Sequence, residues 1–419
     1  MKKKFLFKIS LFLFFSGQSL ADEIQFQFTE GQIGLASEIV SKLESNHLIK
    51  KDYIEIKKEV FDLYIDRLDP NKNIFTSEEV DQFFKILKSD SLMKEDLRTA
   101  FNLFNKYANR YQQRYEAQIK FLDAIDENNL KSSRRLNRNL SEGKRLFDSG
   151  ALIKLWEDLS TNDVIQLMLA GNSLEESVIK TKKRMANQLN YFDQTRDDDV
   201  FNIFINSITS IYGPHTTYMS PKNSEDFDIN MSLSLEGIGA LLSSDGLYTS
   251  ISSLVPGGPA EKTEALKPED KIIGIGQDDQ GEIIDVIGWR IDDVVDLIRG
   301  PKGTKVRLEV IPSTSINDSE TNEIEIIRNI VKLEDQAAEK KVLTIKRDDA
   351  DYKVGVIELP AFYFDFDAYQ KRDYSYKSSS KDVKKLLKEL KTENIDGLVI
   401  DLRNNGGGSL YEANACLLY

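Results

Sequence analysis

The segment that decides the fold is Gly397-Leu398-Val399-Ile400-Asp401-Leu402-Arg403-Asn404-Asn405-Gly406-Gly407-Gly408. Its first half is short, apolar and rich in β-branched residues, which predicts a strand buried on both faces, as in a parallel sheet. The three glycines cannot continue a strand, but they allow positive φ and a close approach of the backbone to another group. α/β folds place sites at such strand ends. The backbone N–H groups there can hold a carboxylate, a phosphate or an oxyanion, and a tight turn without chemistry is the alternative.

The residues before this segment predict the rest of a βαβ unit. The run from Lys353 to Leu359 is typical of a strand. An amphipathic helix follows from Lys381 to Glu393, with Ser380 as its expected N-cap. Strand, helix and strand in this order predict a right-handed crossover between parallel strands.

Composition limits the possible functions of the 419-residue chain. It is 40% apolar and 10% aromatic, which indicates a folded protein of several domains. The formal charge is −13, and this disfavours nucleic acid as a partner, because phosphate binding needs a basic surface. Cys416 is the one cysteine, and His47 and His215 are the two histidines, so we expect no disulfide framework, no metal site and no cofactor. His215 lies in a proline-flanked loop and is interpreted as a hydrogen-bonded structural residue.

The N-terminus has the pattern of a bacterial secretory signal. Four lysines within the first eight residues precede an apolar stretch from Ile9 to Phe15, which is too short to span a bilayer. Small residues at Ser19 and Ala21 predict cleavage after Ala21. We therefore expect export to the periplasm, which fits a chain with so few cysteines.

Residues from about 30 to 205 predict a helical bundle. One apolar stripe at steps of three and four marks a long helix, and Thr76-Ser77-Glu78-Glu79 is a capping box that begins another. The segment Asp69–Asn73 resembles the start of a calcium loop, but its sixth and twelfth positions hold Ile74 and Val80 in place of glycine and glutamate. It is interpreted as a turn between helices. The stripe consists of Leu97, Phe101, Phe104, Ala108, Tyr111, Tyr115, Ile119 and Leu122.

Residues 231–312 predict a small domain of short strands. Strands are expected at Tyr248–Leu254, Lys271–Gly276 and Lys305–Ile311, with a helix at Ile291–Ile298. Together with the turns Pro-Gly-Gly-Pro-Ala and Gly-Pro-Lys-Gly, this order resembles a PDZ domain of the bacterial envelope type.

The PDZ resemblance implies a site for the C-terminus of a peptide. Gly237-Ile238-Gly239 occupies the place of the loop whose backbone N–H groups hold the terminal carboxylate while the peptide adds as a strand. Leu235 and Ile238 are expected to line the pocket for the last side chain. A glycine turn without a ligand is the alternative.

A helical region, a PDZ domain and then Asp-Leu-Arg-Asn-Asn-Gly-Gly-Gly together resemble the C-terminal processing peptidases of family S41, and most closely the tail-specific branch. This resemblance implies a multidomain α+β fold, with the PDZ domain inserted ahead of an incomplete α/β (crotonase/ClpP-like) protease core. It also implies a serine nucleophile with a lysine base, and an oxyanion donor at Gly406 or Gly407. Asp401 and Arg403 are expected to brace the turn.

The family's serine and lysine follow this turn by a further segment, and we expect this chain, which ends at Tyr419, to lack them and to be inactive. Possible substitute nucleophiles fit poorly by position. Ser409 occupies the wrong motif position, Cys416 has no histidine near it, and the serines at 378–380 have only an adjacent Lys381.

The expected organisation is therefore a signal peptide at 1–21, a helical domain at 22–230, a PDZ domain at 231–312, the first part of the protease core at 313–413 and a divergent tail at 414–419. The expected partners are proteins or peptides with free nonpolar C-termini, with an envelope adaptor as a further option. Three hypotheses remain open: a periplasmic serine endopeptidase, a PDZ module that binds C-termini without hydrolysis, and a helical scaffold.

Overall fold

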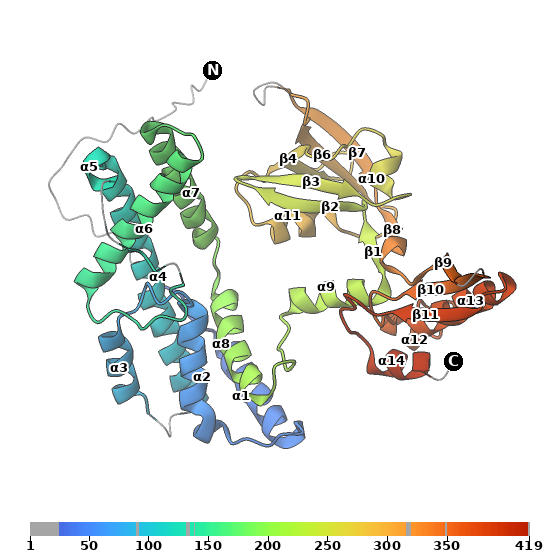
Figure 1. The fold of residues 1–419 in the computed structure, drawn as a ribbon, viewed down its shortest axis with the longest axis horizontal. Helices are drawn as coiled ribbons and strands as arrows, with labels where there is room; N and C mark the ends of the chain where they lie inside the picture. The colour runs from blue at the N-terminus through green and yellow to red at the C-terminus, as the bar shows by residue number, and fades with distance from the viewer. Residues whose placement is uncertain are drawn as a thin grey trace. The chain divides into compact units, whose positions relative to one another are not determined.

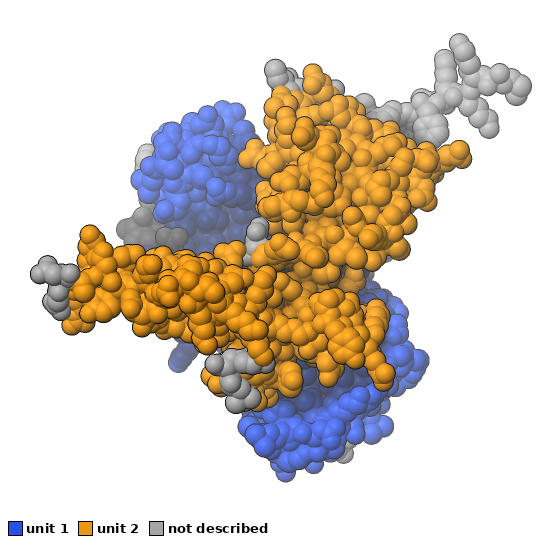
Figure 2. Space-filling model, turned by 90° about the vertical axis from the view of Figure 1, so that its right-hand side faces the viewer, with its two compact units in different colours: residues 1–218 blue, residues 219–419 orange. Residues whose placement is uncertain are grey.

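The computed structural model describes residues 25–88, 92–130, 135–137, 139–315, 320–347 and 350–417. The predicted signal peptide at 1–21 lies outside these residues. The chain forms two compact units, residues 1–218 and residues 219–419, which Figure 2 shows in different colours. In the part of the chain that the structure describes, no helix is long and apolar enough to cross a bilayer.

The first unit is helical, as the sequence predicts (Figure 1). Its main core is formed by α1, α2, α4 and α8, and a smaller apolar cluster joins α4, α6 and α7. The predicted stripe lies on α4 and serves both clusters, because Phe101 and Phe104 pack in the first and Leu122 packs in the second. The helices are α1 (Glu30–Asn46), α2 (Tyr53–Leu68), α3 (Ser77–Ile86), α4 (Met93–Asp123), α5 (Glu127–Leu130), α6 (Ser149–Leu169), α7 (Leu174–Asp193) and α8 (Asp197–Tyr212).

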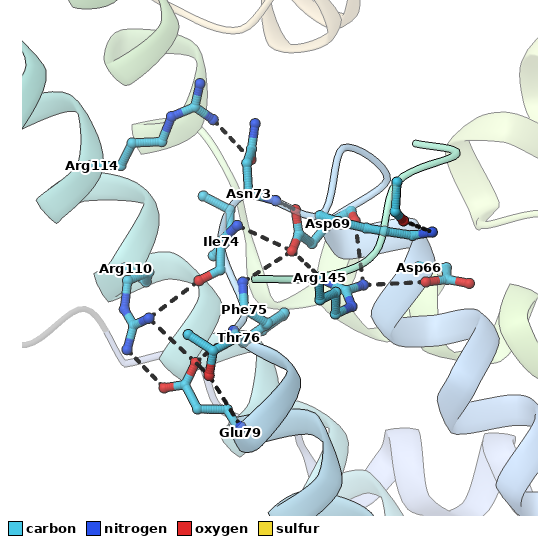
Figure 3. A network of polar contacts seen from close by, with 12 residues as sticks. Asp66, Asp69, Asn73, Ile74, Phe75, Thr76, Glu79, Arg110, Arg114 and Arg145 are labelled. Atoms are coloured by element: carbon cyan, nitrogen blue, oxygen red, sulfur yellow. Dashed lines mark hydrogen bonds and ion pairs between the residues drawn. The ribbon is translucent and has the colours of Figure 1, made fainter. Parts of the chain in front are cut away.

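The turn between α2 and α3 is built around the buried carboxylate of Asp69 (Figure 3). This carboxylate accepts hydrogen bonds from the N–H groups of Asn73 (2.8 Å), Ile74 (3.1 Å) and Phe75 (3.0 Å), and it forms an ion pair with Arg145. A carboxylate surrounded by N–H donors and a guanidinium is arranged to hold a turn and not to ligate a cation. The interpretation of this segment as a turn between helices is confirmed.

The predicted capping box at the start of α3 is also present. Thr76 accepts from the N–H of Glu79 (3.1 Å), and the Glu79 carboxylate accepts in return from the N–H of Thr76 (3.0 Å). Lys106 and Arg110 lie 2.9 and 2.8 Å from the same carboxylate. Burial acts to raise the pKa of Glu79, but the Thr76 N–H and the two cations outweigh it and lower that pKa to about 2.

His215 differs from its predicted role. It is exposed and forms no hydrogen bond among the described residues. Its neighbour Thr216 is bonded instead, through its hydroxyl, to Nε2 of His47 at 3.1 Å. The histidine that holds this loop is therefore His47, which is distant in the sequence.

The second unit begins with α9 (Pro221–Ser232) and continues into a small antiparallel sheet with strand order β2-β3-β4-β6-β7, in which β5 pairs with β4 (Figure 1). Three predicted elements, β3, β6 and α11, have the expected bounds. β7 lies beyond residue 312, where the sequence placed the domain end, and extends the same sheet. The elements are β2 (Ala240–Asp245), β3 (Tyr248–Leu254), α10 (Pro259–Lys262), β4 (Lys271–Gln277), β5 (Ile284–Asp285), α11 (Ile291–Ile298), β6 (Lys305–Ile311) and β7 (Asn322–Ile327).

A two-stranded ribbon leads into and out of this domain. β1 (Ser234–Gly237) pairs antiparallel with β8 (Asn329–Lys332), and Gly237 lies opposite Asn329. The sequence did not predict β8, because four residues of mixed polarity are too few to show the apolar periodicity of a strand. A short 3₁₀ turn at Glu334–Gln336 follows the ribbon.

The remainder forms a three-stranded sheet of order β11-β10-β9 with one helix in its crossover. β10 and β11 are parallel and are joined by α13, so the predicted βαβ unit is confirmed. The elements are β9 (Glu339–Arg347), β10 (Ala350–Glu358), α12 (Phe366–Gln370), α13 (Ser379–Thr392), β11 (Gly397–Asp401) and α14 (Leu410–Leu417).

Contrary to what its apolar pattern alone predicts, β11 is not buried on both faces, but the exposure of Val399 and Ile400 agrees with the expectation of an incomplete protease core. Leu398, Val399 and Ile400 are 43%, 48% and 40% exposed, because β11 is an edge strand that pairs only with β10. α13 places Val383 and Leu390 in a core with Ile357 of β10, and this core does not reach the β11 side chains. The prediction for Ser380 is also wrong, since α13 begins at Ser379 with Ser378 at the N-cap position.

We expect Asp69→Asn to destabilise the first unit by about 2–4 kcal/mol, because an amide cannot satisfy several N–H donors and a guanidinium as a carboxylate does. Urea unfolding can be followed by the fluorescence of Trp156, whose indole N–H donates to the carbonyl of Asn73 (2.7 Å). A Trp289→Phe background leaves Trp156 as the only tryptophan. The control is Asp66→Asn, which removes an exposed partner of Arg145 and should cost less than about 1 kcal/mol. Equal unfolding midpoints for the two variants would contradict this role for Asp69.

The Glu79 carboxylate should make stability depend on pH in the acid range. Its pKa in the fold is about 2 against an ordinary 4.5, so its contribution is complete above about pH 4.5 and is lost as the pH falls towards 2. We expect wild type to be more stable than Glu79→Gln at pH 7 and the difference to shrink between about pH 5 and pH 2. Urea midpoints across this range measure the effect, and Glu78→Gln is the control from the same helical turn. A difference that does not change with pH would contradict this account.

Candidate functional site

The predicted carboxylate loop lies between β1 and β2 and has two free donors. The carbonyls of Ile238 and Gly239 point inward and accept from the N–H groups of Ala260 (2.7 Å) and Val255 (2.9 Å). The N–H groups of Ile238 and Gly239 donate to no acceptor among the described residues. Two adjacent backbone donors of this kind can hold a carboxylate.

Gly239 is required at its position by the backbone. Its φ is +76°, and a Cβ there would lie 3.3 Å from the Cα of Gly258 and 3.3 Å from the methyl groups of Val331. A side chain would therefore be strained and crowded at once. The close packing of the two glycines keeps the loop against the segment whose N–H groups donate to the loop carbonyls.

β2 and α11 lie against each other next to this loop. β2 is the edge strand of its sheet, so its outer backbone groups can pair with an added strand. Ala240 and Leu242 of β2 and Leu297 of α11 are partly buried against the core of the small domain. These side chains, which the sequence analysis did not select, are candidates for contact with the last residues of a bound peptide.

The two predicted pocket residues do not come together. Ile238 is buried in the core of the small domain, whereas Leu235 packs against a separate cluster with Val331 and Leu333. Gly237, the last residue of β1, separates the two in the sequence. Leu235 as a peptide-binding residue stays a prediction, and the structure places it beside a groove that is described below.

Arg328 fixes the position of α11. It is buried at the joint between β7 and β8, and burial lowers its pKa. Its guanidinium donates to the carbonyls of Ile298 (2.8 Å) and Leu297 (3.0 Å), which are the last residues of α11, and to the side chain of Gln277 (2.6 Å). The helix end thus has a cation on its free carbonyls, which suits the helix dipole.

The glycine turn after β11 folds back on the segment that follows β10. The N–H of Gly406 donates to the carbonyl of Pro360 (2.9 Å), and the N–H of Gly407 donates to the side-chain oxygen of Asn405 (2.8 Å). Both predicted oxyanion donors are therefore engaged within the chain. The N–H of Gly408 has no acceptor among the described residues and is a further candidate.

The backbone at position 408 also requires glycine. Its φ is +131°, and a Cβ would lie 2.4 Å from the carbonyl oxygen of Phe362. The N–H of Ser409 donates to this same carbonyl at 2.8 Å. Hydrogen bonds to Pro360 and Phe362 thus hold the turn against the segment after β10 on both sides of the glycines.

Asp401 and Arg403 brace the start of the turn, as predicted. The guanidinium of Arg403 forms a two-pronged contact with the carboxylate of Asp401, with Nε 3.0 Å from Oδ1 and a terminal nitrogen 2.7 Å from Oδ2. Hydrogen bonding from Arg403 lowers the pKa of Asp401 to about 2. The side chain of Arg403 is 86% exposed and that of Asp401 is 13% exposed, so the pair orients the turn more than it stabilises the fold.

A buried carboxylate connects the turn to α13. Glu412, in the first turn of α14, is 1% exposed. Its Oε2 accepts from the hydroxyl groups of Ser378 (2.6 Å) and Ser379 (3.1 Å) and from the N–H of Ser380 (2.7 Å). α13 is therefore capped by a carboxylate from another helix, where the sequence predicted its own serine. An acidic residue soon after Ser409 signals a helix start, but no sequence pattern names its partners.

The side chains considered as substitute nucleophiles are engaged in these and neighbouring contacts. Ser378 and Ser379 are committed to Glu412, and Ser409 accepts from the N–H of Glu412 (3.3 Å). The Nζ of Lys381 lies instead over the ring of Tyr376, 3.0 Å from its centre, and donates to the carbonyl of Tyr374 (3.1 Å). Burial lowers the pKa of Lys381 and raises that of the Cys416 thiol.

Across the described ranges, no group of three or more His, Cys, Asp or Glu side chains is placed to hold a metal ion.

Three family models match the chain. They are the tail-specific protease N-terminal domain over residues 39–222, the PDZ domain over residues 226–311 and peptidase family S41 over residues 353–419. The order of these matches agrees with the order of the predicted regions.

Curated relatives carry the same family names. The tail-specific protease of Haemophilus influenzae is 35% identical over 388 residues, which cover 90% of this chain and 52% of that protein. The carboxy-terminal processing protease CtpA of Bacillus subtilis is 30% identical over 224 residues, covering 53% of this chain and 41% of that protein. The chain thus spans about half the length, or less, of these two relatives. Among solved structures, the PDZ domain of a carboxy-terminal protease from Vibrio cholerae, in complex with peptide, is 49% identical, with coverage of 24% of this chain and 99% of that chain and a TM-score of 0.23.

Replacing Glu412 by glutamine should loosen α14 and the glycine turn. All three donors bond to one carboxylate oxygen, Oε2, and a neutral amide oxygen in its place would accept weaker hydrogen bonds because the charge is lost. We expect hydrogen–deuterium exchange to accelerate by about tenfold or more at residues 378–382 and 406–417. The control is Glu389→Gln on α13, which removes only a contact with Lys340. Unchanged exchange in both regions would show that Glu412 does not hold them together.

Proposed function

The chain carries the N-terminal, PDZ and S41 domains of the tail-specific proteases, and on this premise we propose that it recognises nonpolar C-termini of exported proteins and takes part in their proteolysis. The observation that carries the proposal is the pair of free N–H groups at Ile238 and Gly239, at the start of an edge strand. A peptide that pairs with β2 would place its terminal carboxylate on these donors and its last side chain against Leu242 and Leu297.

A second candidate function is binding of C-termini without hydrolysis. It is favoured by the engaged N–H groups of Gly406 and Gly407 and by the commitment of Ser378 and Ser379 to Glu412. In either case the β2 edge is the first point of contact with the polypeptide. We further propose that this contact takes place in the periplasm, on the support of the basic and apolar N-terminal pattern with small residues at Ser19 and Ala21.

Peptide binding should depend on a free C-terminus and on Leu242. Fluorescence anisotropy with a labelled peptide of nonpolar C-terminus should show binding, and amidation of that C-terminus should weaken it by about tenfold or more because the carboxylate is lost. Leu242→Ala should weaken binding by about five- to thirtyfold through lost apolar contact. Leu241→Ala, at a more exposed neighbouring position, is the matched control. Equal affinity for the free and amidated peptides would overturn the proposed function.

Hydrolysis separates the two candidates. The purified chain is incubated with an unfolded protein that has a nonpolar C-terminus, and products are resolved by mass. Cleavage that requires the free C-terminus would select the protease, and binding without cleavage would select the module.

A further inference from the structure

A large groove lies beside β1, the strand that leads into the carboxylate loop. It has a volume of about 900 Å³ and is bounded by α9, the β1–β8 ribbon, the turn after α11 and α12. Leu235 and Glu236 line it, and they directly precede Gly237 on β1. All of these elements belong to the second unit.

The lining of this groove has an excess of negative charge. Six of its side chains are carboxylates, and two, Arg299 and Lys371, are cationic. Arg299 is already paired with Asp226 (2.8 Å) and lies 3.7 Å from Glu225. In contrast, Asp228 and Asp367 form no ion pair or hydrogen bond through their side chains among the described residues. The side chain of Lys371 likewise forms no ion pair or hydrogen bond among the described residues, so the negative excess of the groove comes from its six carboxylates against two cations.

Exposed apolar groups lie between these carboxylates. Glu236 and Ile330 are cross-strand partners in the ribbon, so their side chains share one face. Ile330 is 46% exposed, and Phe366 of α12 is 43% exposed. The groove thus alternates apolar surface with unneutralised carboxylates.

This combination matches one kind of side chain. Lysine and arginine have a long apolar stem and a cationic head, so the stem can cover Ile330 while the head reaches a carboxylate such as Asp228 or Asp367. A cationic head can also lie over the ring of Phe366. An anionic segment would be repelled, and a purely apolar segment would leave the carboxylates without partners.

We propose that this groove binds lysine- or arginine-bearing segments of the same polypeptide whose C-terminus is held at Ile238 and Gly239. The inference rests on the proposed function and adds a second determinant of substrate choice to it. The protein would select unfolded chains that combine a nonpolar C-terminus with a basic segment farther from the end.

The test uses three labelled peptides of about 25 residues, which reach up to about 80 Å when extended. All end in the same nonpolar residues. One carries four lysines in its N-terminal half, the second has glutamine at those positions, and the third is the lysine peptide with an amidated C-terminus. Anisotropy is measured at low and at about 0.3 M salt, because an electrostatic preference should weaken with ionic strength.

Two matched double variants locate the effect. Asp228→Asn/Asp367→Asn removes two negative charges from the groove, and Glu282→Gln/Asp351→Asn removes two from exposed positions outside it. We expect the wild-type chain to bind the lysine peptide about tenfold more tightly than the glutamine peptide. The groove variant should reduce this preference to about twofold, and the control variant should keep it.

The outcomes separate the two proposals. If amidation abolishes binding but the lysine and glutamine peptides bind alike, or both double variants behave alike, the groove inference is overturned and the proposed function stands. If amidation has no effect, the proposed function fails and the inference fails with it. A lysine preference that depends on the free C-terminus and is lost only in the groove variant supports both.

Discussion

The pairing of β1 with β8 is the constraint on which the second unit depends. β1 leads the chain into the PDZ domain and β8 leads it out, and their register places Gly237 opposite Asn329. The carboxylate loop therefore begins beside Arg328, whose guanidinium holds the end of α11. A slip of one residue would expose Val331 and bury Ile330, so the buried face of the ribbon specifies the register. The β1–β8 pairing thus fixes the positions of the carboxylate loop, of α11 and of the groove beside the ribbon relative to one another.

Three buried charges in the described part of the chain are each held by several hydrogen bonds at a turn or a helix end. Asp69 accepts from three N–H groups of its own turn and from Arg145, and Arg328 donates to carbonyls at a helix end. Glu412 is held by two serine hydroxyls and one N–H at the start of α13. A buried charge without such partners would cost several kcal/mol, so each of these contacts fixes a specific backbone conformation. In each case the backbone that is fixed is a turn or a helix end next to a proposed site or in the helical core.

Recognition by this chain would then have two chemically different parts. The β2 edge offers backbone hydrogen bonds and a carboxylate site, which read the end of a polypeptide and are tolerant of its sequence. The groove beside the ribbon offers carboxylates and apolar surface, which read side chains. The two surfaces meet at residues 235–239, so a single change in the ribbon would affect both.

Local pattern was sufficient for much of this architecture. The capping box of Thr76 and Glu79, the bounds of α11 and β6, the βαβ unit and the pair formed by Asp401 and Arg403 all follow from periodicity, helix-start signals or motifs a few residues long. The models for the PDZ domain and for family S41 likewise match in the order that the sequence predicts. In the capping box and in the pair of Asp401 and Arg403 the interacting residues are close in the sequence, so their spacing carries the signal.

The tertiary structure alone decided which groups are free to act. The carboxylate that caps α13 comes from Glu412, more than thirty residues away, and β8 was found only through its pairing with β1. Gly406 and Gly407 are glycines in the expected place, yet their N–H groups are taken by Pro360 and Asn405, while those of Ile238, Gly239 and Gly408 have no acceptor in the described part of the chain. The exposure of Leu398 to Ile400 depends on what packs beside β11 and not on their own hydrophobicity. The sequence determined which backbone conformations these residues can adopt, and the tertiary structure determined their hydrogen-bond partners and neighbours, because those come from distant segments that no local spacing encodes.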